Sequence, residues 1–196
     1  NDALKPEHNI ENDTSRTALL ALKAAKEAWG NTEAATDLKL GVISGNSVGG
    51  MDFSEQFMLE WIQSETSPDA LLTPHPCGYS TELIAKAIPG VNYFNTISTA
   101  CSSGANAILQ AVQMMKAGRL DRAIAGGTDS LSVFTIRGFS SLMIFDNEIC
   151  KPFDKNRKGL NLGEGAGYLL LETEESVRQS GNKILARISG YGISEN

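Results

Sequence analysis

VNYFNTISTACSSGANAILQAVQMMK, residues 91–116, is the stretch that decides the fold. Its first nine residues are rich in β-branched and aromatic side chains, which predicts a strand over residues 91–99. A helix is expected over residues 102–116, ended by Gly118, and it should be buried on most sides because it carries few charges before its end. Cys101 therefore lies where a strand gives way to a helix.

The same alternation of strand and helix patterns continues on both sides of this unit. Strands are predicted over residues 38–44, 122–126, 166–172 and 184–192, and helices over residues 14–29, 53–64, 81–88 and 174–179. The first helix is expected to have Asp13 or Thr14 as its N-cap and to end at Gly30. Residues 67–78 contain three prolines and predict a loop, and residues 131–145 are mixed and apolar. This alternation favours an α/β fold with a five-stranded, mostly parallel mixed sheet covered by helices on both faces.

The composition is that of an ordinary globular chain, since 41% of its 196 residues are hydrophobic and 20% are charged. We expect a single domain with a sizeable core. The net charge of −6 argues against broad nucleic-acid binding, and no apolar run approaches the roughly 20 residues that span a bilayer. Three cysteines argue against a disulfide framework and favour a reducing, cytoplasmic setting. No metal-ligand spacing occurs, and we expect no metal or cofactor.

Cys101 is the candidate catalytic residue. At the first turn of a helix, unpaired main-chain N–H groups and the helix dipole favour a thiolate over a thiol, which makes the sulfur a nucleophile. The same N–H groups can hold the oxyanion that forms when a thioester carbonyl is attacked. The alternative, a small buried structural cysteine, has equal weight on position alone. Cys77 and Cys150 lack this setting, and we interpret both as structural.

Other candidate residues have weaker support. Residues 45–50 form a glycine-rich loop without the Lys-Ser/Thr of a phosphate-binding loop, so a tight loop is favoured. Glu164 could be catalytic, but a carboxylate that accepts from main-chain N–H groups in a tight turn is favoured. His8 lies in a polar leader. His75 is the only plausible base for Cys101, and an acyl hydrolase built on the two requires His75 within about 3–4 Å of the sulfur.

Several motifs together carry a family resemblance. They are SGNSVGG (residues 44–50), TACSSGANAI (99–108), IAGGTDSL (124–131) and CKPFDKNRKGLNLGEGAGYLLLE (150–172), in that order. In this order and spacing they resemble the β-ketoacyl-acyl carrier protein synthases, the condensing enzymes of fatty acid and polyketide synthesis. The stretch FTIRGFSSLMIF (134–145) is closer to the bacterial synthases of aryl-polyene-type pathways. The resemblance implies a thiolase-like fold with two similar αβα halves, usually as a homodimer.

The resemblance also implies a mechanism and partners. Cys101 matches the nucleophile that takes an acyl group from acyl carrier protein; malonyl-loaded carrier protein then loses carbon dioxide, and its carbanion attacks the acyl thioester. A basic cluster, Lys151, Lys155, Arg157 and Lys158, could meet the carrier, although a solvated loop is favoured.

The family's first strand, its two active-site histidines, its second-half lysine and its gating loop do not occur here. We therefore expect residues 1–196 to be the N-terminal half of a synthase, inactive alone in condensation. Two alternatives are a non-catalytic partner similar to chain-length factors, which generally lack the cysteine, and the cysteine acyl hydrolase.

Overall fold

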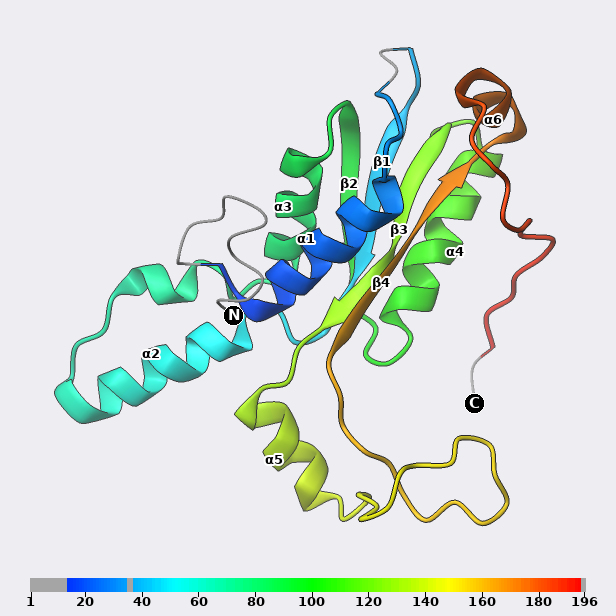
Figure 1. The fold of residues 1–196 in the computed structure, drawn as a ribbon. Coiled ribbons are helices and arrows are strands. Elements are labelled where there is room, and N and C mark those ends of the chain that lie inside the picture. Colours follow the sequence, from blue (N-terminus) through cyan, green and yellow to red (C-terminus); the bar gives the residue numbers. More distant parts are fainter. Residues whose placement is uncertain (1–13, 35–36, 195–196) are drawn as a thin grey trace.

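A mixed sheet forms the centre of the molecule in the computed structural model, which describes residues 14–34 and 37–194. In this part of the chain the sheet has four strands, β1 (Leu40–Gly45), β2 (Val91–Ile97), β3 (Arg122–Asp129) and β4 (Gly165–Glu172), in the order β2-β1-β3-β4 (Figure 1). β1 is parallel to both β2 and β3, whereas β4 is antiparallel to β3. The predicted mostly parallel mixed sheet is therefore confirmed. Asp13 and His8 lie outside the described residues.

Helices cover both faces of the sheet, as predicted. α1 (Arg16–Trp29) and α3 (Gly78–Ala87) pack on one face, and α4 (Ser103–Lys116) packs on the other (Figure 1). The strands supply apolar side chains to both sides in alternation: Val42 and Ile124 contact the α1 side, and Ile43 contacts the α4 side. Because β1 is buried along its whole length, the sheet is the middle layer of an αβα arrangement.

Local hydrogen bonds and a glycine set where α1 begins and ends. The hydroxyl of Ser15 accepts from the main-chain N–H of Ala18 and caps α1, so the N-cap lies one residue beyond the predicted Thr14. Gly30 ends α1 with a φ of 56°, as predicted. α4 buries one face, with Ser103, Ala107, Ala111 and Met114, rather than most sides. The small residues Ser103, Ala107 and Ala111, at four-residue spacing, let this helix approach the sheet closely.

The fifth predicted strand is wrong. Within the described part of the chain, residues 184–192 form no strand. Ile184, Leu185 and Ile188 are exposed there, and the segment pairs with no described strand. A strand needs a neighbour for its main-chain hydrogen bonds, so an apolar pattern alone does not make one.

Other elements also differ in extent from the prediction, and α3, for example, begins three residues before its predicted start. The proline-rich loop contains a short 3₁₀ helix, η1 (Asp69–Leu72), and the mixed segment after β3 contains α5 (Val133–Ser141). β3 runs three residues past its predicted end because β4 pairs with it as far as Asp129. α6 (Glu174–Ser180) agrees with the prediction to within a residue.

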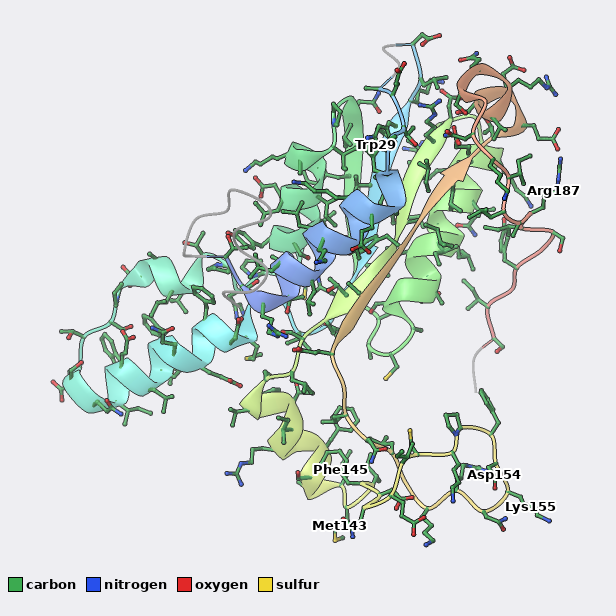
Figure 2. The ribbon with its side chains drawn as sticks, in the orientation of Figure 1. Trp29, Met143, Phe145, Asp154, Lys155 and Arg187 are labelled. Atoms are coloured by element: carbon green, nitrogen blue, oxygen red, sulfur yellow. The ribbon has the colours of Figure 1, made fainter. Side chains whose placement is uncertain are left out.

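α2 (Met51–Ser64) and α5 extend away from the sheet (Figure 1). Within the described residues neither helix buries a side chain. Figure 2 shows Met143 and Phe145 just beyond the end of α5, far from Trp29 in the core. Among the described residues, no helix has the length and apolarity to cross a membrane.

Candidate active site around Cys101

The turn between β2 and α4 exposes Cys101. Ala100, just before it, has a φ of 52°, which is uncommon for a residue with a side chain. Ser103 holds this turn at both ends: its hydroxyl donates to the carbonyl oxygen of Ala100 at 2.7 Å and accepts from the N–H of Thr99 at 2.8 Å. The alternative of a buried structural cysteine requires a buried residue, and Cys101 is exposed.

Main-chain donors surround Cys101. The N–H groups of Ser102 and Ser103 donate to the carbonyl oxygens of Thr99 and Ala100. The N–H groups of Cys101 and Gly104 have no acceptor among the described residues. They lie at the N-terminal end of α4, where the helix dipole contributes partial positive charge. The turn can therefore stabilise negative charge on the sulfur or on an oxygen beside it.

Cys101 opens on a hollow of about 330 Å³. Four separate segments line it: Gly45 from β1; Ala100, Cys101, Ser103 and Gly104; Gly127, Thr128 and Asp129 from β3; and Gly165, Ala166 and Gly167 from β4. The glycine-rich motifs, interpreted from sequence only as tight turns, thus meet at the cysteine. Small residues on every wall leave space in front of the sulfur.

Two of these glycines let α4 approach the strands. A Cβ atom on Gly45 would lie 2.3 Å from the carbonyl carbon of Ser103, and one on Gly127 would lie 3.0 Å from the Cα atom of Gly104. Main-chain atoms at these distances cannot move aside as a flexible side chain can. The absence of side chains at both positions therefore sets the position of the cysteine turn.

The loop after β1 is fastened to the end of β3. Asp129 accepts from the N–H groups of Ser47 and Val48 at 2.9 and 2.8 Å. Asn46, fully buried, donates to the carbonyl oxygen of Cys77 at 2.8 Å. These hydrogen bonds agree with the tight loop favoured from sequence for residues 45–50. Sequence reasoning missed Asp129, although a carboxylate at the end of a buried strand was a usable signal.

Glu164 is bound to an arginine that sequence reasoning also missed. The Nε atom of Arg16 lies 2.8 Å from both carboxylate oxygens of Glu164, and its Nη2 atom contacts one of them. Glu164 also accepts from the N–H of Leu131 at 3.3 Å, which is a main-chain donor as favoured from sequence, but Leu131 lies 33 positions away and not in the tight turn around Glu164. The hydrogen bond from Arg16 holds the pKa of Glu164 below its ordinary value.

The remaining candidates lie elsewhere. The Nδ1 atom of His75 is 2.7 Å from the hydroxyl of Ser54, and within the described ranges no histidine lines the hollow at Cys101. The structure therefore gives no support to an acyl hydrolase built on His75. Cys77 is half-buried, and burial raises the pKa of its thiol. Cys150 is half-buried in the loop before β4.

Known proteins are similar to this chain in sequence and in fold. Residues 7–176 match the family described as Beta-ketoacyl synthase, N-terminal domain. Nodulation protein E of Rhizobium sp. (strain N33) is 31% identical over 96% of this chain and 50% of its own length. The 3-oxoacyl-[acyl-carrier-protein] synthase 2 of Staphylococcus aureus is also 31% identical, over 97% of this chain and 49% of its own.

A solved structure agrees with these sequence matches. The ishigamide ketosynthase/chain length factor superposes with a TM-score of 0.80 at 26% identity, over 90% of this chain and 46% of that one. The chain spans about half the length of the curated relatives it matches. The motifs around Cys101, the thiolase-like α/β architecture and the family match agree: the chain belongs to the β-ketoacyl synthase family of condensing enzymes.

Proposed function

We propose that the protein carrying this chain is a β-ketoacyl-acyl carrier protein synthase, which joins an acyl thioester to a malonyl thioester with loss of carbon dioxide. The observation that carries the proposal is Cys101, which is exposed before α4 and faces a hollow, beside main-chain N–H groups that have no acceptor among the described residues. Membership of the family supports this class of reaction. We propose that the protein acts in fatty acid or polyketide synthesis, and aryl polyenes are one class of polyketide that it could produce.

In the first half-reaction Cys101 becomes acylated. Its thiolate attacks the carbonyl carbon of an acyl group carried as a thioester by acyl carrier protein. The bond from the Cys101 sulfur to the carbonyl carbon forms, the bond to the carrier's sulfur breaks, and the carrier leaves as a thiol after taking a proton. The N–H of Cys101 donates to the oxyanion between these steps, as main-chain donors do in acyl transfer.

In the second half-reaction the acyl group leaves Cys101. The malonyl group on a second carrier loses carbon dioxide, and its carbanion attacks the acyl carbonyl carbon, which releases the Cys101 thiolate. Stabilising that carbanion needs hydrogen-bond donors, and no histidine is among the described residues lining the hollow. We assign these donors to residues beyond the 196, so that this chain is one N-terminal domain and does not condense substrates alone.

The proposed partners are carrier protein and a second copy of the protein. Among the described strands β2 pairs with β1 alone and is an edge strand, and we propose that its other side pairs with a strand of a second copy. In the basic cluster, Lys151 and Lys158 lie 3.7 and 3.5 Å from Glu148, which supports a solvated loop there rather than a carrier-docking patch. Lys155 lies on the outer bend of that loop (Figure 2).

A non-catalytic partner of the chain-length-factor kind is the second candidate. The similarity to the ishigamide ketosynthase/chain length factor favours it as much as it favours a synthase. Cys101 counts against it, because such partners generally lack the nucleophile. For either candidate we propose a cytoplasmic location, in line with three free cysteines.

The test is transfer of an acyl group to Cys101 in the intact protein. Incubation with hexanoyl-loaded carrier protein should add one hexanoyl group to the Cys101 peptide, detected by mass spectrometry. Cys101→Ala should abolish the adduct, whereas Cys150→Ala, matched in chemistry but distant in sequence, should retain it. An unmodified Cys101 peptide, or an adduct that persists in the Cys101→Ala variant, would contradict the proposal.

A further inference from the structure

The wall of the hollow opposite the cysteine turn begins at Glu164. Gly165, Ala166 and Gly167, which follow it directly, line the hollow. A Cβ atom on Gly163, Gly165 or Gly167 would meet nothing within 4 Å, so among residues 165–167 only Ala166, which packs against the core, has a side chain that helps to hold this end of β4. Glycines also add conformational freedom to the main chain. The β3–β4 ladder pairs residues 165–167 with residues 127–129, so the point at which this wall begins depends on what anchors the residue just before the ladder.

Glu164 supplies that anchor through two contacts from different parts of the fold. Arg16, the first residue of α1, donates to both carboxylate oxygens of Glu164, and the N–H of Leu131 donates to one of them. Leu131 lies two residues beyond Asp129, which is paired with Gly165 across the β3–β4 ladder and also lines the hollow. Paired contacts from a guanidinium to a carboxylate fix orientation as well as distance.

Arg16 in turn is tied to α2. Its main-chain N–H donates to the Oδ2 atom of Asp52 at 2.9 Å. The start of α1, the start of α2, the end of β3 and the start of β4 are thus joined by one set of polar contacts. The side chains of Arg16 and Glu164 are 33% and 23% exposed, so water screens the pair only in part.

We propose that Glu164 is a positioning residue for acyl transfer: bound to Arg16 and to the Leu131 N–H, it fixes the wall formed by residues 165–167 and so sets how an acyl chain lies in front of Cys101. The inference rests on the proposed acylation of Cys101. It assigns Glu164 no contact with substrate and no role in proton transfer. A displaced wall would misplace the acyl carbonyl carbon relative to the sulfur, and a misplacement of about 1 Å can cost a hundredfold in rate.

The experiment measures acylation of the intact protein by p-nitrophenyl hexanoate and p-nitrophenyl acetate. The Cys101 thiolate attacks the ester carbonyl carbon, the carbon–sulfur bond forms, and the bond to p-nitrophenolate breaks. The coloured p-nitrophenolate gives the rate, and the rate of the Cys101→Ala variant is subtracted. Alkylation of Cys101 by iodoacetamide, which is small and has no acyl chain to align, is measured in parallel.

An ion pair within the β3–β4 ladder provides the control. Arg122 and Glu172 are paired at the opposite end of β3 and β4, with Nε and Oε1 2.8 Å apart and both side chains buried. Glu172→Gln therefore damages the same two strands without touching the hollow. Thermal unfolding of both variants shows whether each is folded at the assay temperature.

We expect Glu164→Gln to lower the hexanoate rate about tenfold and the acetate rate less, with iodoacetamide alkylation of Cys101 nearly unchanged. Glu164→Asp, which keeps the charge, should restore part of the loss, and Glu172→Gln should change the two ester rates equally. If wild-type Cys101 acylates but Glu164→Gln matches it, or if both glutamine variants lose equally, this inference alone is overturned. If wild-type Cys101 does not acylate, the proposed function falls and the inference with it.

Discussion

Cys101 is exposed because of its neighbours rather than its own side chain. Ala100 takes a positive φ and Ser103 binds the main chain on both sides of the turn. We expect iodoacetamide to label Cys101 faster than Cys77 or Cys150, because Cys101 is exposed beside main-chain N–H groups whereas the other two are half-buried, and burial raises the pKa of the Cys77 thiol. Peptide mass spectrometry after timed labelling gives the three rates.

The labelling rates must be measured on folded protein, since an unfolded chain would expose all three thiols alike. Circular dichroism before each time course provides that check, and labelling in urea gives the rates without structure. Equal or slower modification of Cys101 in the folded protein would remove the physical basis for its role as a nucleophile.

The residues of the site divide into those that sequence reasoning could find and those it could not. Cys101 could be predicted because its setting is local: a strand pattern, a cysteine and a helix pattern follow one another. That Glu164 accepts from a main-chain N–H was predictable too, although the donor, Leu131, lies 33 positions away and not in the tight turn where it was expected. Arg16 was not, because it meets Glu164 across 148 positions of sequence, and no local pattern records such a contact.

At the scale of elements, the contact between β1 and α4 decides where the cysteine turn lies. Gly45→Ala would place a Cβ atom 2.3 Å from the carbonyl carbon of Ser103. We expect it to lower the free energy of unfolding by about 1–3 kcal/mol, the usual cost of forcing atoms into a packed site. Urea denaturation followed by circular dichroism measures the change.

Gly163→Ala is the matched control for this substitution. It adds the same methyl group at a glycine where a Cβ atom meets nothing within 4 Å. A loss of stability as large as that of Gly45→Ala would mean that glycine flexibility, and not the close approach of α4, explains the effect. A stable Gly45→Ala protein would show that α4 can shift away from β1.

Elements with a buried face were the predictable part of the fold. The strand at Val91–Ile97 and the helix at Ser103–Lys116 carry periodic apolar residues that pack in the structure, and both were predicted within two residues. The segment 184–192 carries a similar apolar pattern but pairs with none of the strands that the structure describes. Whether a strand forms depends on a partner, which the segment's own sequence does not contain.

At the scale of the whole molecule, the sheet has two edge strands, β2 and β4, and each exposes one large apolar side chain. Phe94 on β2 is 53% exposed and Leu169 on β4 is 50% exposed. Exposed edges with apolar side chains invite pairing with another chain. If the homodimer forms through β2, a substitution at Phe94 should affect it and one at Leu169 should not, although the two side chains are similarly exposed.

We expect Phe94→Asp to weaken dimerisation of the intact protein at least about tenfold, because a carboxylate within a strand-to-strand interface loses water without gaining a partner. Leu169→Asp places the same charge on the other edge and should leave the dimer unchanged. Sedimentation velocity over a concentration series gives both dissociation constants. Weakening by Leu169→Asp alone would move the interface to β4, and a monomeric wild-type protein would exclude the homodimer. The comparison requires both variants to remain folded. We expect this because both positions are exposed on edge strands and neither side chain fills the core.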